Sequence, residues 1–191
     1  MSLPSHLKKL NLGCGLDIKE GGGWINLDVA NIPGCDVVYN IENLPLPFPN
    51  NHFEEILCND ILEHIEYTSV LKDLHRVLAP GGIMHIRVPH FTSKNNAIDP
   101  THKRIFSIET FDFFCNGTTK GNKAGRYMYP DFVFNVAQAP HLTFEHSLKF
   151  FWYNKIIERW VNTSRERQQL YESTGLSHLF PAQNILISLV K

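Results

Sequence analysis

The sequence predicts an α/β fold in which a mostly parallel β-sheet carries helices on both faces. Two observations support this prediction. Several short apolar runs are bounded by glycine, proline or polar turn residues, which is typical of buried parallel strands. One amphipathic helix stands between two such runs, and a strand–helix–strand unit of this kind joins parallel strands by a right-handed crossover.

Length and charge limit the classes of protein to consider. The 191 residues suit a single domain over 1–191, and 43% hydrophobic residues are enough for a core. A formal net charge of −1 argues against a nucleic-acid partner, which usually meets a strongly basic surface. The sequence has no apolar run of about 18 residues and no signal-peptide pattern, so we expect a cytoplasmic protein without a membrane span.

Cysteine and histidine spacing indicates neither disulfides nor a metal centre. The four cysteines show no C-x-x-C pair, so reduced thiols are favoured over a zinc ribbon or a redox motif. The ten histidines include no H-x-x-x-H or H-E-x-x-H pair, and the spacing of His85 and His90 is too weak to indicate a site. The prediction from spacing is therefore that the chain has no metal site.

The expected elements follow from runs and breakers. A helix is predicted where Val70, Leu71, Leu74, Val77 and Leu78 form one apolar face, with Thr68 or Ser69 as cap and Pro80-Gly81-Gly82 as stop. A second helical face runs from Tyr153 to Val161. The irregular segment 91–130 follows a strand end and is interpreted as a lid or substrate insertion. The expected strands are 8–12, 24–28, 36–40, 55–58, 83–88, 132–136 and 185–190.

A glycine turn followed by an acidic strand end indicates a nucleoside-containing cofactor. Gly13-Cys14-Gly15 closes the first strand, and Asp28 ends the next one, thirteen positions beyond Gly15. Glycines there let a ligand approach the backbone, and a carboxylate at the neighbouring tip can accept hydrogen bonds from both ribose hydroxyls. A plain tight turn would also explain the glycines.

A nicotinamide dinucleotide fits this turn poorly. The third glycine of the dinucleotide fingerprint is missing after Gly15, and residues 16–23 are too few and too glycine-rich for a full crossover helix. The N-terminus of that helix is what would hold a pyrophosphate. A cofactor without phosphates does not need the helix.

At this point the sequence resembles the class I S-adenosylmethionine-dependent methyltransferases, and most closely their small members with a truncated first crossover. The resemblance runs in order from about residue 10 to residue 89. It rests on Leu10–Gly15, Trp24–Asp28, Leu44–Phe53, Asn59–Ile65 and Leu74–Gly82.

The resemblance implies a Rossmann-like, seven-stranded, mostly parallel sheet whose sixth and seventh strands form an antiparallel edge hairpin. It also implies S-adenosyl-L-methionine as cofactor. Asn11, Gly13 and Gly15 would face its methionine part, and Asp28 its ribose. Asn40 and Ile41 would lie by the adenine, while Asn59 and Asp60 would line the site after the fourth strand.

Histidines after the fifth strand are the candidates for catalysis. His90 and His102 lie where that strand ends, and a neutral histidine could accept a proton from a hydroxyl acceptor. Arg104 is the candidate substrate residue. The alternative is that His102 and Arg104 only fasten the lid. Glu63-His64 is interpreted as holding the loop before the helix through backbone hydrogen bonds.

The predicted function is methyl transfer from S-adenosylmethionine to a small-molecule or glycan-like acceptor, at oxygen or nitrogen. The alternatives are a non-catalytic cofactor-binding partner or sensor and, less favoured, a nicotinamide-dependent enzyme. Residues 150–153, Phe-Phe-Trp-Tyr, could form a membrane-surface or homodimer contact, but their helical spacing favours core packing. No nucleic-acid partner is expected, and a homodimer is left open.

Overall fold

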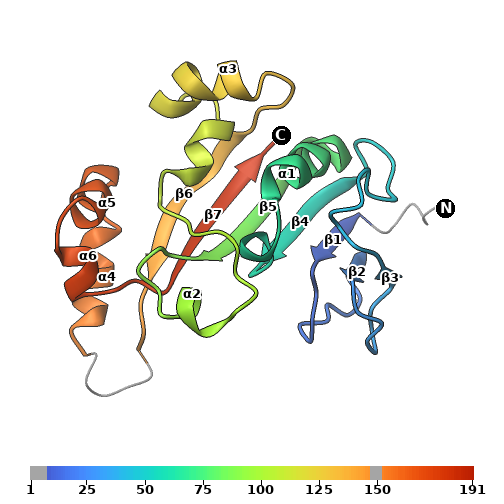
Figure 1. The fold of residues 1–191 in the computed structure, drawn as a ribbon. Helices are drawn as coiled ribbons and strands as arrows, with labels where there is room; N and C mark the ends of the chain where they lie inside the picture. Colours follow the sequence, from blue (N-terminus) through green and yellow to red (C-terminus); the bar gives the residue numbers. More distant parts are fainter. Residues whose placement is uncertain (1–7, 147–151) are drawn as a thin grey trace.

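The computed structural model describes residues 8–146 and 152–191, which fold around one seven-stranded sheet (Figure 1). The strand order is β3-β2-β1-β4-β5-β7-β6. The strands are β1 Lys9–Leu12, β2 Trp24–Asp28, β3 Val37–Val38, β4 Phe53–Asn59, β5 Leu78–Pro89, β6 Asn135–Thr143 and β7 Asn184–Val190.

Parallel pairing brings the first five strands together with their carboxyl ends at one edge. On β1, Leu10 lies opposite Ile25 of β2 and Ile56 of β4, and all three side chains are buried. Strand β7 runs antiparallel between β5 and β6. The mostly parallel sheet and its antiparallel edge pair are thus confirmed, although residues 144–183, and not a tight turn, join β6 to β7.

The sixth strand was predicted in the wrong place. It begins at Asn135 and not at Phe132, and it continues to Thr143. Phe132 and Phe134 are buried in an aromatic cluster with Phe114 and lie outside β6. Their apolar pattern therefore comes from this cluster and not from a position in the sheet. The strand itself is largely exposed and contains Pro140, which an edge position tolerates because one side of an edge strand needs no hydrogen-bond donor.

Helix α1, Tyr67–Val77, confirms the predicted amphipathic helix, with Val70, Leu71, Leu74 and Val77 buried. The expected caps are wrong: Glu66 precedes the first helical residue, so Thr68 and Ser69 lie inside the helix. The helix also ends before Pro80, because the chain is already extended at Leu78 where β5 begins.

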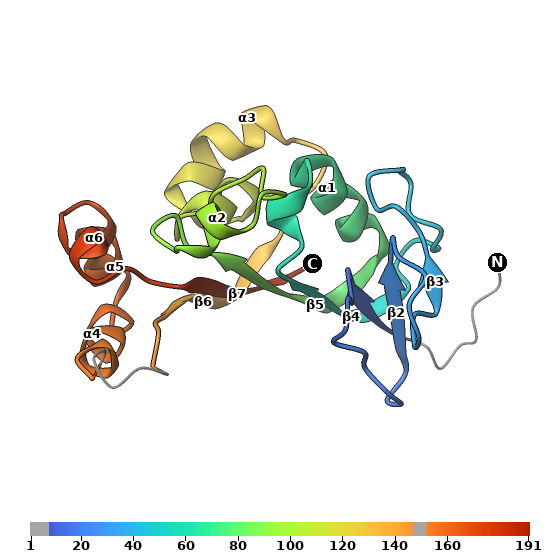
Figure 2. The same ribbon diagram turned by 60° about the horizontal axis from the view of Figure 1, so that its bottom comes forward.

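The remaining helices are short. They are α2 Asn95–Ile98, α3 Arg126–Met128, α4 Asn154–Val161, α5 Arg165–Glu172 and α6 Leu176–Leu179. Helix α4 forms where the second helical face was predicted, with Val161 buried but Ile156 exposed. Trp152 is also exposed, against the expected core packing, and Phe150 and Phe151 lie outside the described residues. Figure 2 shows α1, α2 and α3 on the same side of the sheet, with α4, α5 and α6 gathered beyond its β6 edge.

No helix connects β1 to β2, β2 to β3 or β3 to β4 in the part of the chain that the structure describes. This agrees with the prediction that residues 16–23 are too short for a crossover helix. Among residues 8–146 and 152–191, no helix is long and apolar enough to cross a membrane.

The end of α1 depends on the side chain of Lys191. Its Nζ donates to the carbonyl oxygens of His75 at 2.6 Å and Leu78 at 2.8 Å, and to Asn51 Oδ1 at 2.7 Å. A cation at this position satisfies carbonyl groups that have no partner within the helix and complements the negative end of the helix dipole.

Replacing Lys191 with methionine keeps the methylene stem but removes the donors, and should lower the free energy of unfolding by about 1–2 kcal/mol. Urea denaturation measures the change. The exposed Lys123→Met is the matched control and should unfold like the parent chain. An equal, small effect in both variants would show that the cap contributes nothing.

Candidate functional site

Two cavities open where the parallel strands end. One, of about 360 Å³, lies at the ends of β1 and β2, and the other, of about 490 Å³, lies at the ends of β4 and β5. His64 lines both cavities, so they meet at this residue. We call them the β2 cavity and the β5 cavity. Their position agrees with the general rule that ligands of open α/β sheets bind outside the carboxyl ends of the strands.

The glycine turn forms one wall of the β2 cavity. Gly13 has φ +65°, and a Cβ on it would lie 2.6 Å from Ile61 Cδ1. The Asp28 carboxylate accepts hydrogen bonds from the amides of Gly15 and Ala30, both at 2.9 Å. Asp28 therefore holds the turn against the end of β2 while also lining the cavity.

The β2 cavity is apolar on one side and polar at its rim. Asp28 and Asn40 supply carboxylate and amide groups. The apolar lining comes from three regions of the chain, which sequence reasoning recognised only at Ile41. The lining residues are Gly13, Leu27, Asp28, Val29, Tyr39, Asn40, Ile41, Glu42, Ile61, His64, Ile65 and Thr101.

Side-chain amides hold the segment that replaces the first crossover helix. Asn26 accepts from the Lys19 amide at 2.9 Å and donates back to the Lys19 carbonyl oxygen at 3.0 Å. Asn11 donates to the Asp17 carbonyl oxygen at 2.8 Å and to Asn26 Oδ1 at 3.0 Å. Asn11 and Asn26 are nearly fully buried, and their hydrogen bonds to Asp17 and Lys19 fasten the loop after the glycine turn to strands β1 and β2.

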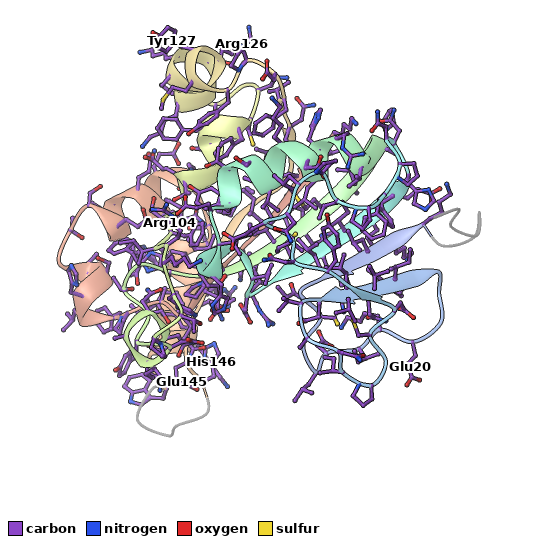
Figure 3. All side chains as sticks on the ribbon, turned by 45° about the vertical axis from the view of Figure 1, so that its right-hand side comes forward. Glu20, Arg104, Arg126, Tyr127, Glu145 and His146 are labelled. Atoms are coloured by element: carbon purple, nitrogen blue, oxygen red, sulfur yellow. The ribbon has the colours of Figure 1, made fainter. Side chains whose placement is uncertain are left out.

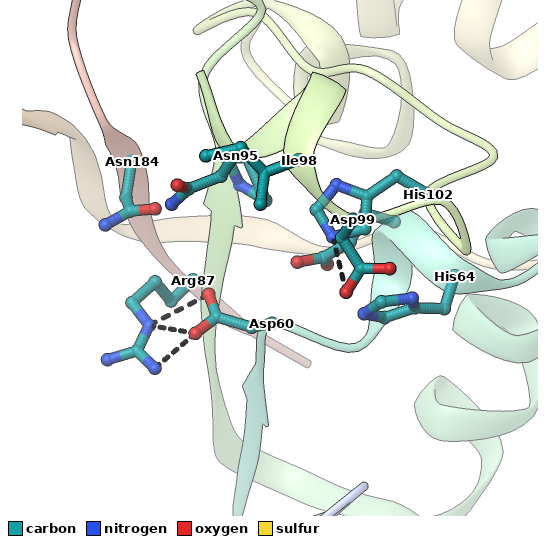
Figure 4. A pocket seen from close by; sticks show the side chains of 10 residues that line it. Asp60, His64, Arg87, Asn95, Ile98, Asp99, His102 and Asn184 are labelled. Atoms are coloured by element: carbon teal, nitrogen blue, oxygen red, sulfur yellow. Dashed lines mark hydrogen bonds and ion pairs between the residues drawn. The ribbon is translucent and has the colours of Figure 1, made fainter. Parts of the chain in front are cut away.

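The β5 cavity is lined by charged and amide side chains (Figure 4). Asp60 and Arg87 form a two-armed ion pair, with Arg87 Nε 3.0 Å from both carboxylate oxygens. Asp60 adopts φ +52°, a backbone conformation that aspartate tolerates better than most residues. The other lining residues are Glu63, His64, Pro89, Asn95, Ile98, Asp99, His102 and Asn184.

A short 3₁₀ turn, Leu62–His64, joins the two cavities to the segment after β5. The Glu63 carbonyl oxygen accepts from the amides of Lys103 at 2.7 Å and Arg104 at 3.1 Å. His64 Nδ1 lies 2.8 Å from Thr101 Oγ1. Residues 99–104 are therefore fastened over the end of β4, and His102 is brought beside His64, with ring centroids 4.7 Å apart.

The Glu63 side chain is fully buried between these elements. Neither carboxylate oxygen has a hydrogen-bond partner among the described residues, and burial raises the pKa of this carboxyl to about 7. The nearby His102 Nδ1 is also buried without a partner in the described part of the chain. Glu63 and His64 were predicted to hold the loop before the helix through backbone hydrogen bonds. The Glu63 carbonyl oxygen makes such bonds, but this role does not explain the buried carboxylate.

The predicted cofactor residues divide between different places. Gly13, Asp28, Asn40 and Ile41 line the β2 cavity, and Gly15 is bonded to Asp28 at its edge. Asn11 is buried in the amide network. Asp60 lies in the β5 cavity, paired with Arg87. Asn59 ends β4 and is not among the residues that line either cavity.

Of the acceptor-side residues, only His102 lines a cavity, the β5 cavity. His90 is fully buried, and both of its ring nitrogens are engaged, Nδ1 with Thr92 Oγ1 at 2.7 Å and Nε2 with Glu172 Oε1 at 3.0 Å. This geometry corrects the assignment of His90 as a general base, because no ring nitrogen is left to accept a proton from an acceptor molecule.

Arg104 also points elsewhere than predicted. It forms an ion pair with Glu66 on the surface and lines neither the β2 nor the β5 cavity (Figure 3). Its backbone amide, not its guanidinium, makes the contact with the Glu63 turn. Arg87, Asn95 and Asn184 were missed as cavity residues, because polar residues in strands and short helices carry no motif.

Comparisons with known proteins agree with this architecture. Residues 24–86 match the family model described as a methyltransferase domain. An uncharacterized protein of Methanocaldococcus jannaschii is 24% identical over 95% of this chain and 77% of its own length. A SAM-dependent methyltransferase from Archaeoglobus fulgidus has a similar structure, with a TM-score of 0.57 and 20% identity over 96% of this chain and 86% of that one.

A third relative has been solved with a cofactor product. It is a phosphoethanolamine N-methyltransferase of Haemonchus contortus in complex with phosphomonomethylethanolamine and S-adenosylhomocysteine. Its TM-score is 0.50 and its identity 17%, over 96% of this chain and 48% of that one. The solved structures share the fold of this chain, and the family model over residues 24–86 agrees with the class predicted from the motifs, a SAM-dependent methyltransferase of the class I fold.

Replacing Asn26 with alanine should destabilise the protein by about 2–4 kcal/mol, because it removes several buried or partly buried hydrogen bonds. The Lys19 amide and carbonyl lose these partners, and the Asn11 amide keeps only its bond to Asp17. Chemical denaturation measures the loss. The control is Asn31→Ala, an exposed asparagine on the next loop, which should change stability by less than about 0.5 kcal/mol. Similar losses in the two variants would contradict a structural role for the amide network.

Proposed function

We propose that this protein transfers a methyl group from S-adenosylmethionine to a polar small-molecule or glycan-like acceptor, at oxygen or nitrogen. The observation that supports this most is the pair of cavities that meet at His64. One cavity suits a nucleoside and the other a polar acceptor. A methyl group held at their junction would have the acceptor on its open side.

The β2 cavity has the chemistry that the cofactor needs. Asp28 keeps acceptor capacity beyond its two backbone amides, because an ionised carboxylate has about four lone-pair sites. Two of these sites could serve the ribose hydroxyls. Ile41 and Ile65 offer apolar contact for adenine beside the Asn40 amide. Gly13 lines the cavity without a side chain of its own, so a ligand can approach the backbone at the end of β1.

The β5 cavity suits an acceptor that carries hydroxyl, carboxyl or amine groups. Arg87, Asn95 and Asn184 present hydrogen-bond donors, and Asp60 and Asp99 present acceptors. From the expected insertion 91–130, the residues that line this cavity are Asn95, Ile98, Asp99 and His102. Residues 113–130 instead border a separate cavity with Phe132 and Val133. We therefore assign acceptor recognition to the first part of the insertion.

S-adenosylmethionine supplies an activated methyl group, which an acceptor lone pair attacks in line while the carbon–sulfur electrons stay on sulfur. The protein's own contribution is alignment of the two partners and exclusion of water. His64 sits between the cavities and can fix that alignment. His102 is retained as the acceptor-side histidine. The four unpaired cysteines favour the cytoplasm as the place where this occurs.

The test is calorimetry with S-adenosylmethionine, S-adenosylhomocysteine and NAD, followed by a screen of hydroxylated and amino acceptors for release of S-adenosylhomocysteine. Both sulfur ligands should bind and NAD should not. Asp28→Ala should weaken S-adenosylhomocysteine at least about 30-fold, because a carboxylate acceptor of two hydroxyl donors is lost. Binding without turnover on any acceptor would instead support the non-catalytic alternative, and unchanged binding in Asp28→Ala would refute the site.

The two glycines of the turn provide a matched pair for the cofactor wall. Both have positive φ, so alanine strains the backbone at either position, but only at Gly13 does the new Cβ collide with Ile61. Gly13→Ala should therefore lower the affinity for S-adenosylhomocysteine about tenfold more than Gly15→Ala. Isothermal calorimetry compares the two, and equal losses would show that Ile61 does not shape the cofactor site.

A further inference from the structure

Three potential metal ligands converge at the junction of the two cavities. Glu63, His64 and His102 each offer one ligand atom, and these atoms all lie within 4.8 Å of one another. They come from two segments, the turn after β4 and the loop after α2, that the Glu63 carbonyl hydrogen bonds hold together. Figure 4 shows His64 and His102 facing each other across the wall of the β5 cavity.

Three polar atoms of Glu63 and His102 are buried without a hydrogen-bond partner in the described part of the chain. Both Glu63 carboxylate oxygens and His102 Nδ1 have no hydrogen-bond partner among residues 8–146 and 152–191. A buried carboxylate without a partner costs several kcal/mol, so such groups are normally paired, protonated or bound to a cation.

The hydrogen bonds around His64 leave one of its nitrogens available. Thr101 Oγ1 donates to Asp99 Oδ1 at 2.6 Å, so the same oxygen can only accept from His64 Nδ1, 2.8 Å away. The proton then resides on Nδ1, and Nε2 carries a free lone pair. A histidine that donates its other ring N–H to an outer partner is the usual arrangement at metal sites.

The charge around the cluster favours a cation. Arg87 is paired with Asp60 and forms no ion pair with Glu63 or Asp99 among the described residues. Asp99 Oδ2 lies 3.8 Å from His102 Nε2, which keeps a second carboxylate next to the histidines. Glu63 and Asp99 are both among the residues that line the β5 cavity, from which an ion could enter.

We propose that Glu63, His64 and His102 bind a divalent transition metal of the zinc type at the junction of the two cavities. Two histidines and one glutamate form a known three-ligand set for zinc, with a further position open to water or substrate. Here the open position would face the β5 cavity. That an acceptor oxygen takes this position rests on the proposed function, whereas metal binding itself does not.

Binding would draw the three side chains together. Ligands about 2.1 Å from one zinc ion lie roughly 3.4 Å apart in a tetrahedron, so the cluster must contract by about 1 Å. Both histidines sit on short connections, and rotation of their side chains can supply this movement. In this assignment His102 acts as a ligand and not as the proton acceptor predicted from the sequence.

The experiment titrates Zn²⁺ into the full chain, stripped with a chelator, by calorimetry and by thermal unfolding. We expect one ion per chain and a raised Tm, since a ligand that binds only the folded state stabilises it. Glu63→Gln and His102→Asn should each weaken Zn²⁺ at least about tenfold. Thr101→Val, which removes the partner of His64 Nδ1, should weaken it by about tenfold as a positioning residue.

Surface histidines provide the control. His141 and His146 flank Glu158, with Nε2 to carboxylate distances of 3.7 and 2.8 Å, and form another grouping of two histidines and one glutamate. His141→Asn and His146→Asn should leave the Zn²⁺ affinity unchanged. All variants are compared only where their circular dichroism matches the parent.

Three results would overturn the proposal: no Zn²⁺ binding, unchanged affinity in both Glu63→Gln and His102→Asn, or loss of binding in the surface variants. S-adenosylhomocysteine affinity, measured on the same samples without metal, separates this outcome from failure of the methyltransferase assignment. Intact cofactor binding with no Zn²⁺ binding would remove the metal site alone.

Discussion

The site depends on one carbonyl oxygen. The Glu63 oxygen accepts from two successive amides, those of Lys103 and Arg104, and so joins the turn after β4 to the loop after β5. Further contacts of the 99–104 segment come from exposed side chains, through the Thr101–His64 hydrogen bond and the Arg104–Glu66 ion pair. With these contacts, His64 and Thr101 border the β2 cavity while His102 and Asp99 border the β5 cavity.

Strands β1 and β2 have no crossover helix to cover them among the residues that the structure describes. A parallel strand pair usually buries its face under the helix of its crossover connection. Here Asn11 and Asn26 project from β1 and β2 and bond the backbone of the Leu16–Glu20 stretch directly. The loop therefore becomes an ordered layer, and the glycine turn that precedes it keeps its place beside Asp28.

Local pattern explains which parts of this molecule could be predicted from sequence. β2 and α1 are recognisable because their apolar spacing lies within a few residues, and the Gly13–Asp28 pairing follows from two adjacent strand ends. The sixth strand was predicted at the wrong residues because Phe132 and Phe134 pack in an aromatic cluster, whose alternating apolar residues look like a strand in the sequence. The catalytic role of His90 was predicted wrongly because its hydrogen-bond partner Glu172 lies 82 positions away in the sequence.

The meeting of Glu63, His64 and His102 escaped prediction for the same reason. No local pattern in the sequence indicates that Glu63 and His102, nearly forty positions apart, line the same cavity. Yet the buried Glu63 carboxyl has a consequence for stability. Its folded-state pKa is raised to about 7, so the folded protein loses stability as pH rises from about 4.5 through 7, where the unfolded chain has already released the proton. A cation bound by Glu63, His64 and His102 would neutralise this carboxylate and restore the stability that its ionisation removes.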